Sequence, residues 1–150
     1  MTLARFVASG GGCGFLPGAP GTWGSLLAAV LGTGLLFASP WALAAGVVVA
    51  AAAGYWSIPR AQGDADPGWV VIDEIAGQWL AMMALARPGW GVAAAFAVFR
   101  LLDITKPGPI GAIDRRPGRA GVMGDDLAAG AVAACILWAA GQKWPVLHAW

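Results

Sequence analysis

Long apolar segments make up most of the chain, and short stretches rich in glycine, proline and charge separate them. Five of these segments approach or reach the roughly 17–25 residues that a helix needs to cross a bilayer. They cover residues 22–39, 41–58, 70–87, 89–105 and 125–142. The first two carry no charged side chain. The pattern predicts an all-α, polytopic integral membrane bundle of about five spans, built as a single domain over residues 1–150.

Tryptophan and glycine positions add detail to this layout. Tryptophans gather near the predicted span ends, as in an aromatic belt at the membrane interface. They are Trp23, Trp41, Trp56, Trp69, Trp90 and Trp144. Residues 10–25 hold seven glycines and two prolines, which disfavour a continuous helix. We therefore expect a structured glycine-rich loop before the first span.

The composition excludes several classes of protein. Hydrophobic residues make up 59% of the chain and charged residues 11%, against roughly 45–50% and 25% in an average globular domain. The net charge of +1 gives no basic surface for nucleic acid. One histidine and two cysteines without a CxxC pair disfavour a zinc site and a cysteine nucleophile. The expected surroundings are membrane lipids, and nothing in the sequence indicates an oligomeric state.

The distribution of lysine and arginine predicts the orientation. Cytoplasmic loops of membrane proteins carry an excess of these residues. With five spans and the N-terminus inside, six basic residues face the cytoplasm and two face outward. The inner set is Arg5, Arg60, Lys106, Arg115, Arg116 and Arg119, and the outer set is Arg87 and Lys143. The bias favours an internal N-terminus and an external C-terminus.

Five acidic residues fall near the cytoplasmic ends of three predicted spans. Asp73 and Glu74 begin the third span, Asp103 ends the fourth, and Asp125 and Asp126 open the fifth. Ionisable groups inside or bordering a span are costly and usually mark function. Adjacent carboxylates repel one another unless a cation or a proton intervenes. Oxygen ligands without histidine or cysteine suit Mg2+ or Mn2+, so we expect a magnesium site at the cytoplasmic surface.

Potential phosphate ligands flank the same carboxylates. Arg100, Lys106 and Arg119 supply positive charge, while Thr22 and Ser25 supply hydroxyls beside the glycine-rich loop. Mg2+ commonly works with phosphate substrates, and a lipid-borne phosphate suits a site at this depth. For Arg100 and Asp103 alone, an i,i+3 ion pair is an equally good interpretation.

Four motifs in order resemble the bacterial phosphatidylglycerophosphatase A family. They are GFLPGAPGTWGSL (14–26), VIDEIAGQWL (71–80), FRLLDITKPGPI (99–110) and GVMGDDLAAG (121–130). The resemblance implies a Mg2+-dependent enzyme of the bacterial inner (cytoplasmic) membrane. Its reaction would be removal of the terminal phosphate of phosphatidylglycerophosphate to leave phosphatidylglycerol. The family's acidic motifs carry over to Asp73, Glu74, Asp103, Asp125 and Asp126 as catalytic and metal-binding residues.

Two chemical routes are compatible with these residues. In one, a metal held by the carboxylates activates water for direct attack on the phosphorus. In the other, Asp103 or one of the Asp125–Asp126 pair is a nucleophile that forms a phospho-aspartate. An alternative from another class is a small ion-coupled transporter whose acids bind a cation in transit. A transporter would hold its acids near the middle of the bilayer, with water access from both sides.

Overall fold

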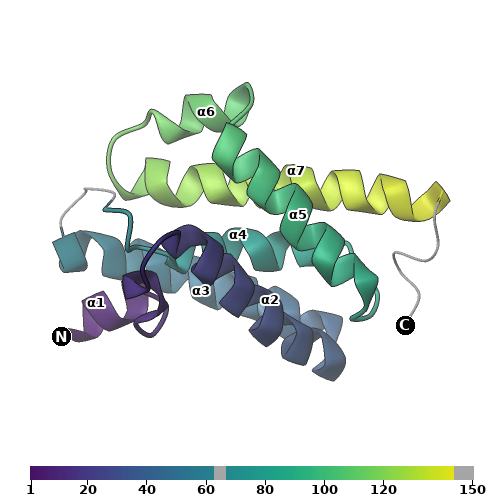
Figure 1. Cartoon of the computed structure of the whole chain (residues 1–150), viewed down its shortest axis with the longest axis horizontal. Coiled ribbons are helices and arrows are strands. Elements are labelled where there is room, and N and C mark those ends of the chain that lie inside the picture. Colours follow the sequence, from purple (N-terminus) through teal and green to yellow (C-terminus); the bar gives the residue numbers. More distant parts are fainter. Residues whose placement is uncertain (63–66, 144–150) are drawn as a thin grey trace.

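The structure, a computed structural model, describes residues 1–62 and 67–143. Within these ranges the chain is entirely helical, with no β-strand. Figure 1 shows the arrangement of the helices. The elements are α1 (Leu3–Ala8), the 3-10 helix η1 (Cys13–Phe15), α2 (Pro20–Ala38), α3 (Pro40–Gln62), α4 (Ile72–Met82), α5 (Trp90–Thr105), α6 (Pro109–Asp114) and α7 (Arg119–Lys143).

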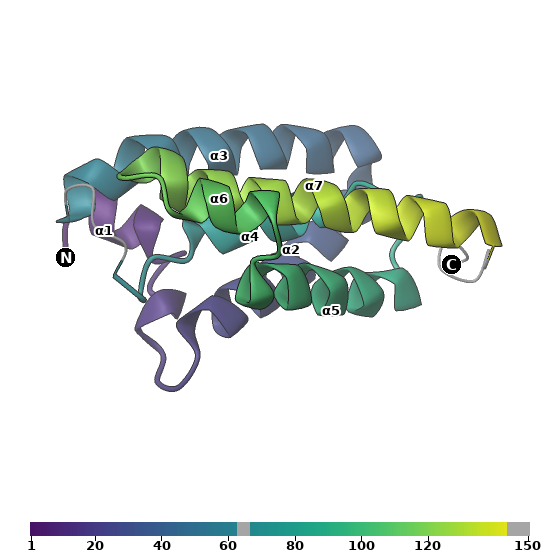
Figure 2. The ribbon, with the colours of Figure 1, turned by 90° about the horizontal axis from the view of Figure 1, so that it is seen from above.

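Helix α4 lies at the centre of the bundle. It contacts α2, α3, α5 and α7, and the longest helices, α3 and α7, run beside it in both views (Figures 1 and 2). The short helix α1 packs on α3, and α6 packs on α7. The start of α4, the end of α5 and the start of α7 lie in the half of the molecule that carries α1 and α6 (Figure 1). This arrangement brings the acid-bearing ends of three helices to one side.

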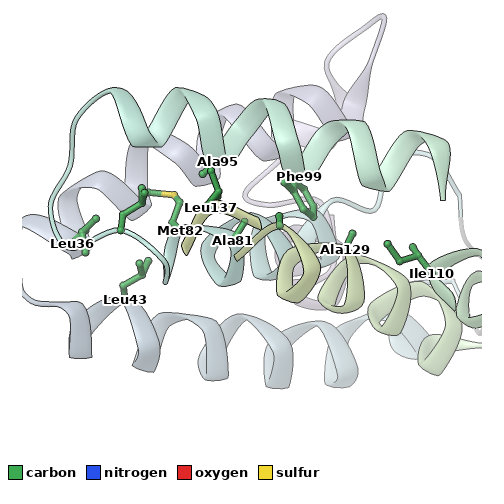
Figure 3. Packing of buried hydrophobic residues seen from close by; sticks show 11 residues of the cluster. Leu36, Leu43, Ala81, Met82, Ala95, Phe99, Ile110, Ala129 and Leu137 are labelled. Atoms are coloured by element: carbon green, nitrogen blue, oxygen red, sulfur yellow. The ribbon is translucent and has the colours of Figure 1, made fainter. Parts of the chain in front are cut away.

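A hydrophobic core surrounds α4 on the side away from the acids. Leu36, Leu43, Met82, Phe99 and Leu137 belong to this core and come from five different helices (Figure 3). Each is at most 4% exposed, so the helices are fixed to one another by close packing. The core therefore provides a rigid support for the polar groups one or two turns further along.

Three helices are long and apolar enough to cross a membrane by length and composition: α2, α3 and α7. Most of their residues are not buried inside the protein, and their outer faces carry large apolar side chains. Val30, Phe37 and Val48 are examples, each more than two-thirds exposed. Such surfaces are costly in water and favourable in lipid. The chain is thus a helical membrane protein.

The expectation of five spans is not confirmed, because two of the predicted segments are shorter helices. The segment predicted over 70–87 contains the 11-residue α4, and the segment predicted over 89–105 contains the 16-residue α5. Val70, Val71 and Leu85 belong to the apolar pattern but lie outside α4 and are at most 3% exposed. Their hydrophobicity reflects burial in protein, which hydropathy does not distinguish from burial in lipid.

The glycine-rich stretch is partly helical. Gly10, Gly11 and Gly12 turn the chain with positive φ, η1 follows, and the last residues of the stretch form the first turns of α2. Pro20 occupies the first turn of α2, where its missing N–H costs nothing. Of the tryptophans expected at span ends, Trp41 is 83% exposed at the start of α3, and Trp144 lies outside the described residues.

A close crossing of α4 and α7 depends on two glycines. A Cβ atom added to Gly77 would lie 2.6 Å from the carbonyl oxygen of Asp126 and 2.6 Å from the Phe99 ring. A Cβ added to Gly130 would collide with the carbonyl oxygen of Gly77. Small residues allow helix backbones to approach in this way within membranes. The crossing lies about one turn from the acidic residues of both helices.

Replacing Gly77 by alanine is expected to destabilise the protein by about 1–3 kcal/mol, because the backbones must separate to accept the methyl group. Gly34→Ala in α2 is the matched control, since nothing lies within 4 Å of its added Cβ. That variant is expected to keep or slightly raise stability through helix propensity. Thermal unfolding of the purified variants in detergent measures both effects. Equal midpoints for the two variants would contradict the tight crossing.

Candidate active site

The predicted acidic residues meet in two overlapping groups. Oxygen atoms of Asp73, Glu74 and Asp126 all lie within 4.8 Å of one another. Oxygen atoms of Asp103, Asp125 and Asp126 satisfy the same limit. Asp126 belongs to both groups and therefore joins them into one cluster. The cluster could bind a metal ion through carboxylate oxygens.

The helices hold these carboxylates away from bulk solvent. Asp73, Asp103, Asp125 and Asp126 are each no more than 9% exposed, and Glu74 is partly buried. Asp73 and Glu74 lie in the first turn of α4, where the positive end of the helix dipole favours negative charge. Burial strengthens electrostatic interactions among all five groups, because little water screens them.

Arg100 connects the cluster to the start of α2. It forms an ion pair with Asp103 one turn later in α5, which is the pairing considered in the sequence analysis. Its Nη2 donates a hydrogen bond of 3.4 Å to Oγ1 of Thr22. A Cβ added to Gly21 would collide with the Glu74 carboxylate and would lie 3.1 Å from Nη1 of Arg100. The first turn of α2 thus lies directly against the charged groups.

Lys106 bridges the cluster to α6. Its Nζ donates a 2.6 Å hydrogen bond to Asp114 and a second one to Asp125. Among the described residues, Lys106 is the only non-glycine residue with positive φ, at 43°. This conformation ends α5 and turns the chain into the Pro107–Gly108–Pro109 segment, so that Lys106 can reach back to α7.

Lys106 and Asp114 shift each other's pKa. Partial burial would lower the pKa of Lys106, but the hydrogen bonds and charges of Asp114 and Asp125 raise it above its ordinary value. The hydrogen bond from Lys106 lowers the pKa of Asp114. Lys106 is therefore a permanent cation at neutral pH, and it offsets one negative charge of the cluster.

The remaining carboxylate oxygens fit a divalent cation. Five acids face two cationic side chains, Arg100 and Lys106, that pair with members of the cluster. Among the described residues, Oε2 of Glu74, Oδ1 of Asp125 and Oδ1 of Asp126 are buried without a hydrogen-bond partner. Buried oxygens of this kind are costly unless a ligand satisfies them. The hard oxygen set suits Mg2+ or Mn2+.

Two predicted phosphate ligands make other contacts. The hydroxyl of Ser25 is fully buried and donates a 2.8 Å hydrogen bond to the carbonyl of Gly21. The guanidinium of Arg119 lies 4.3 Å from the centre of the Tyr55 ring and donates to the Tyr55 carbonyl. Each side chain therefore has a partner outside the cluster. Thr22, Arg100 and Lys106, in contrast, lie beside it.

Two further residues near the cluster were absent from the predicted site. Asp114 ends α6 and accepts a hydrogen bond from Lys106. No sequence motif indicated that the chain would turn back between these two residues, which are eight positions apart. Gln78 is fully buried one turn after Glu74, and neither of its amide atoms has a hydrogen-bond partner among the described residues. Its i,i+4 spacing from Glu74 is the signal that could have included it.

Apolar helices long enough to span a bilayer, with a buried carboxylate cluster at one end, define a membrane protein with a candidate metal-dependent active site. The chain belongs to the phosphatidylglycerophosphatase A family, whose model matches residues 6–141. It is accordingly an enzyme, a phosphatidylglycerophosphatase in the class of phosphoric monoester hydrolases. Family membership favours this class over the ion-coupled transporter.

The chain also aligns with individual relatives over most of their length. The chain is 40% identical over 148 residues to phosphatidylglycerophosphatase A of Escherichia coli K12, covering 95% of this chain and 86% of the relative. It is 34% identical over 148 residues to the Haemophilus influenzae protein of the same name, with 93% and 89% covered. A Bacteroides thetaiotaomicron protein, provisionally named a phosphatidylinositol-3-phosphatase, is 40% identical over 138 residues, with 85% and 87% covered. No solved structure gives a significant match.

The geometry predicts unequal effects for two aspartates that are both replaced by asparagine. Asp126→Asn removes the charge shared by both oxygen groups and is expected to lower phosphate release at least about 10^2-fold. Asp114→Asn breaks only an exposed contact to Lys106, which retains Asp125, and is expected to cost less than about threefold. Turnover of a lipid phosphate in detergent micelles measures both. Similar losses of activity in the two variants would show that Asp126 is no more important for the reaction than Asp114.

Proposed function

We propose that the protein hydrolyses the terminal phosphate of phosphatidylglycerophosphate in a Mg2+-dependent reaction at the cytoplasmic face of the inner membrane. The observation that carries this proposal is the convergence of four buried aspartates and the partly buried Glu74 in one cluster centred on Asp126, in a chain of the phosphatidylglycerophosphatase A family. The products are phosphatidylglycerol and inorganic phosphate.

The carboxylates are proposed to hold the metal and to direct the nucleophile. Asp126, with Asp73 and Glu74 on one side and Asp103 and Asp125 on the other, supplies the oxygen ligands. A bound Mg2+ would polarise the phosphoryl group and lower the pKa of a water molecule. A carboxylate of the cluster that is not engaged by the metal accepts the proton of the attacking water.

Arg100, Lys106 and Thr22 are proposed to bind the phosphate. The buried Nε of Arg100 has no hydrogen-bond partner among the described residues and is a donor available to a phosphoryl oxygen. Lys106, held between Asp114 and Asp125, adds a second positive charge beside the cluster. These cations stabilise charge that grows on the phosphoryl oxygens during the reaction.

The relatives leave two lipid headgroups to compare. Two relatives are named for phosphatidylglycerophosphate, and the third is provisionally named for a phosphatidylinositol phosphate. Both substrates are phosphomonoesters on a diacyl lipid, so the same carboxylates and cations would serve either. The family model and the two relatives named for it favour phosphatidylglycerophosphate. Parallel assays of the two lipids test this choice.

The basic residues support a cytoplasmic site. The segment between α5 and the acids of α7 contains Lys106, Arg115, Arg116 and Arg119, whereas the turn before α5 contains only Arg87. An excess of positive charge of this kind is typical of the cytoplasmic side. The phosphorylated lipid would thus reach the cluster from the inner leaflet.

Removal of divalent metal is expected to abolish activity, because several buried carboxylates cannot remain ionised together without a cation. Phosphate release should fall to background in excess EDTA and return when Mg2+ is added back. Elemental analysis of the chelated protein verifies that no metal remains bound. Full activity in metal-free protein would refute the magnesium proposal.

Opposite ends of α5 are expected to face opposite compartments. Cys13→Ser and Cys135→Ala first remove the native thiols, and Arg116→Cys or Pro88→Cys then introduces a single reporter. The Arg116→Cys thiol should resist a membrane-impermeant reagent in intact cells and react after lysis. The Pro88→Cys thiol should react in intact cells. Labelling of position 116 from outside would place the acids at the wrong leaflet for the proposed substrate.

A further inference from the structure

An apolar groove of about 640 Å3 lies between α2 and α5. Leu26 and Ala29 line it from α2, and Val92, Ala93 and Phe96 line it from α5. Leu26 is 40% exposed and Ala93 is also exposed, so the groove is open along the outer surface of the bundle. Exposed apolar surface of this kind is costly in water and favourable in lipid.

One end of the groove leads to the charged cluster. Thr22 precedes Leu26 by four residues in α2, and Arg100 follows Phe96 by four residues in α5. Residues four apart share one face of a helix, so the polar pair continues the two apolar walls. The hydrogen bond of 3.4 Å between Arg100 and Thr22 joins the walls at this end. Arg100 in turn pairs with Asp103 of the cluster.

We propose that this groove holds an acyl chain of the lipid substrate while Arg100 binds its phosphate. The inference rests on the proposed function and assigns the part of the site that recognises the lipid's apolar portion. From Arg100 to Val92 the wall extends eight residues, about 12 Å at the helical rise. Continuity between a cationic end and an apolar channel matches a molecule with a phosphate at one end and a hydrocarbon chain behind it.

Another groove on the surface lacks this continuity and provides a control. It has a volume of about 470 Å3 and is lined by Met83, Ala84, Trp138, Ala139 and neighbouring apolar residues. Ala139 is exposed and lies 13 residues after Asp126 in α7, about 20 Å along the helix. Ala139 is thus farther along its helix from the carboxylates than Val92 is from Arg100.

The first test fills each groove with the same side chain. Ala93→Trp is expected to raise the KM for long-chain phosphatidylglycerophosphate about tenfold or more, because it displaces methylene groups from their apolar contacts. Hydrolysis of the deacylated headgroup, glycerophosphoglycerophosphate, should stay within about twofold of the parent protein. Ala139→Trp should leave the kinetics of both substrates unchanged. Equal effects on both substrates in Ala93→Trp, or no effect on the long-chain lipid, would overturn the proposal.

The second test does not need turnover or a substituted protein. Phosphatidylglycerophosphate with a photoreactive diazirine in one acyl chain is bound to the unmodified protein and irradiated, and the labelled peptides are identified by mass spectrometry. Label concentrated in α2 and α5, and displaced by excess unlabelled lipid, supports the groove. Label spread evenly over the exposed faces of α3 and α7 means ordinary membrane contact and overturns it. If the unmodified protein does not hydrolyse phosphatidylglycerophosphate, the proposed function is refuted. The labelling would still show whether an acyl chain occupies the groove.

Discussion

The close approach of α4 and α7 at Gly77 and Gly130 is the constraint on which the site depends. Each glycine faces the other helix's backbone, so a side chain at either position would push the helices apart. The same crossing sets Asp73 and Glu74 against Asp126, one turn away on the two helices. Carboxylate oxygens must lie within a few ångströms to share a cation, and the glycines make that distance possible. Packing and chemistry are therefore specified by the same two residues.

Electrostatic compensation explains the contacts around the crossing. Burial of several like charges is unfavourable, and Arg100 and Lys106 offset part of it through ion pairs with Asp103 and Asp125. Lys106 reaches its position only because the chain adopts positive φ there, a conformation that a non-glycine residue rarely adopts. Within the described residues, the two cations leave oxygens of Glu74, Asp125 and Asp126 unpartnered, and these oxygens could bind a metal ion.

Much of this organisation can be predicted from the sequence, and the exceptions have physical causes. The helical segments and the convergence of acids follow from apolar runs and from carboxylates placed at segment ends. The hydropathy pattern predicted a segment longer than α4, because Val71 and Leu85 are apolar residues that are buried in the protein outside this helix. Likewise, the hydroxyl of Ser25 bonds within its own helix, and Arg119 stacks on Tyr55. Such contacts depend on tertiary packing, which residue type and spacing do not determine.

The shortness of α4 has a consequence for how the protein is made. An 11-residue helix leaves its terminal N–H and C=O groups inside a bilayer core if it enters alone, and it carries two acids in its first turn. Neighbouring helices must shield both features, and α7, which α4 contacts closely, is synthesised after all the other described helices. The carboxylate cluster therefore cannot form before Asp125 and Asp126 have been synthesised. A nascent chain that ends before α7 lacks Asp125 and Asp126, so it cannot assemble the site or act on the membrane's lipids.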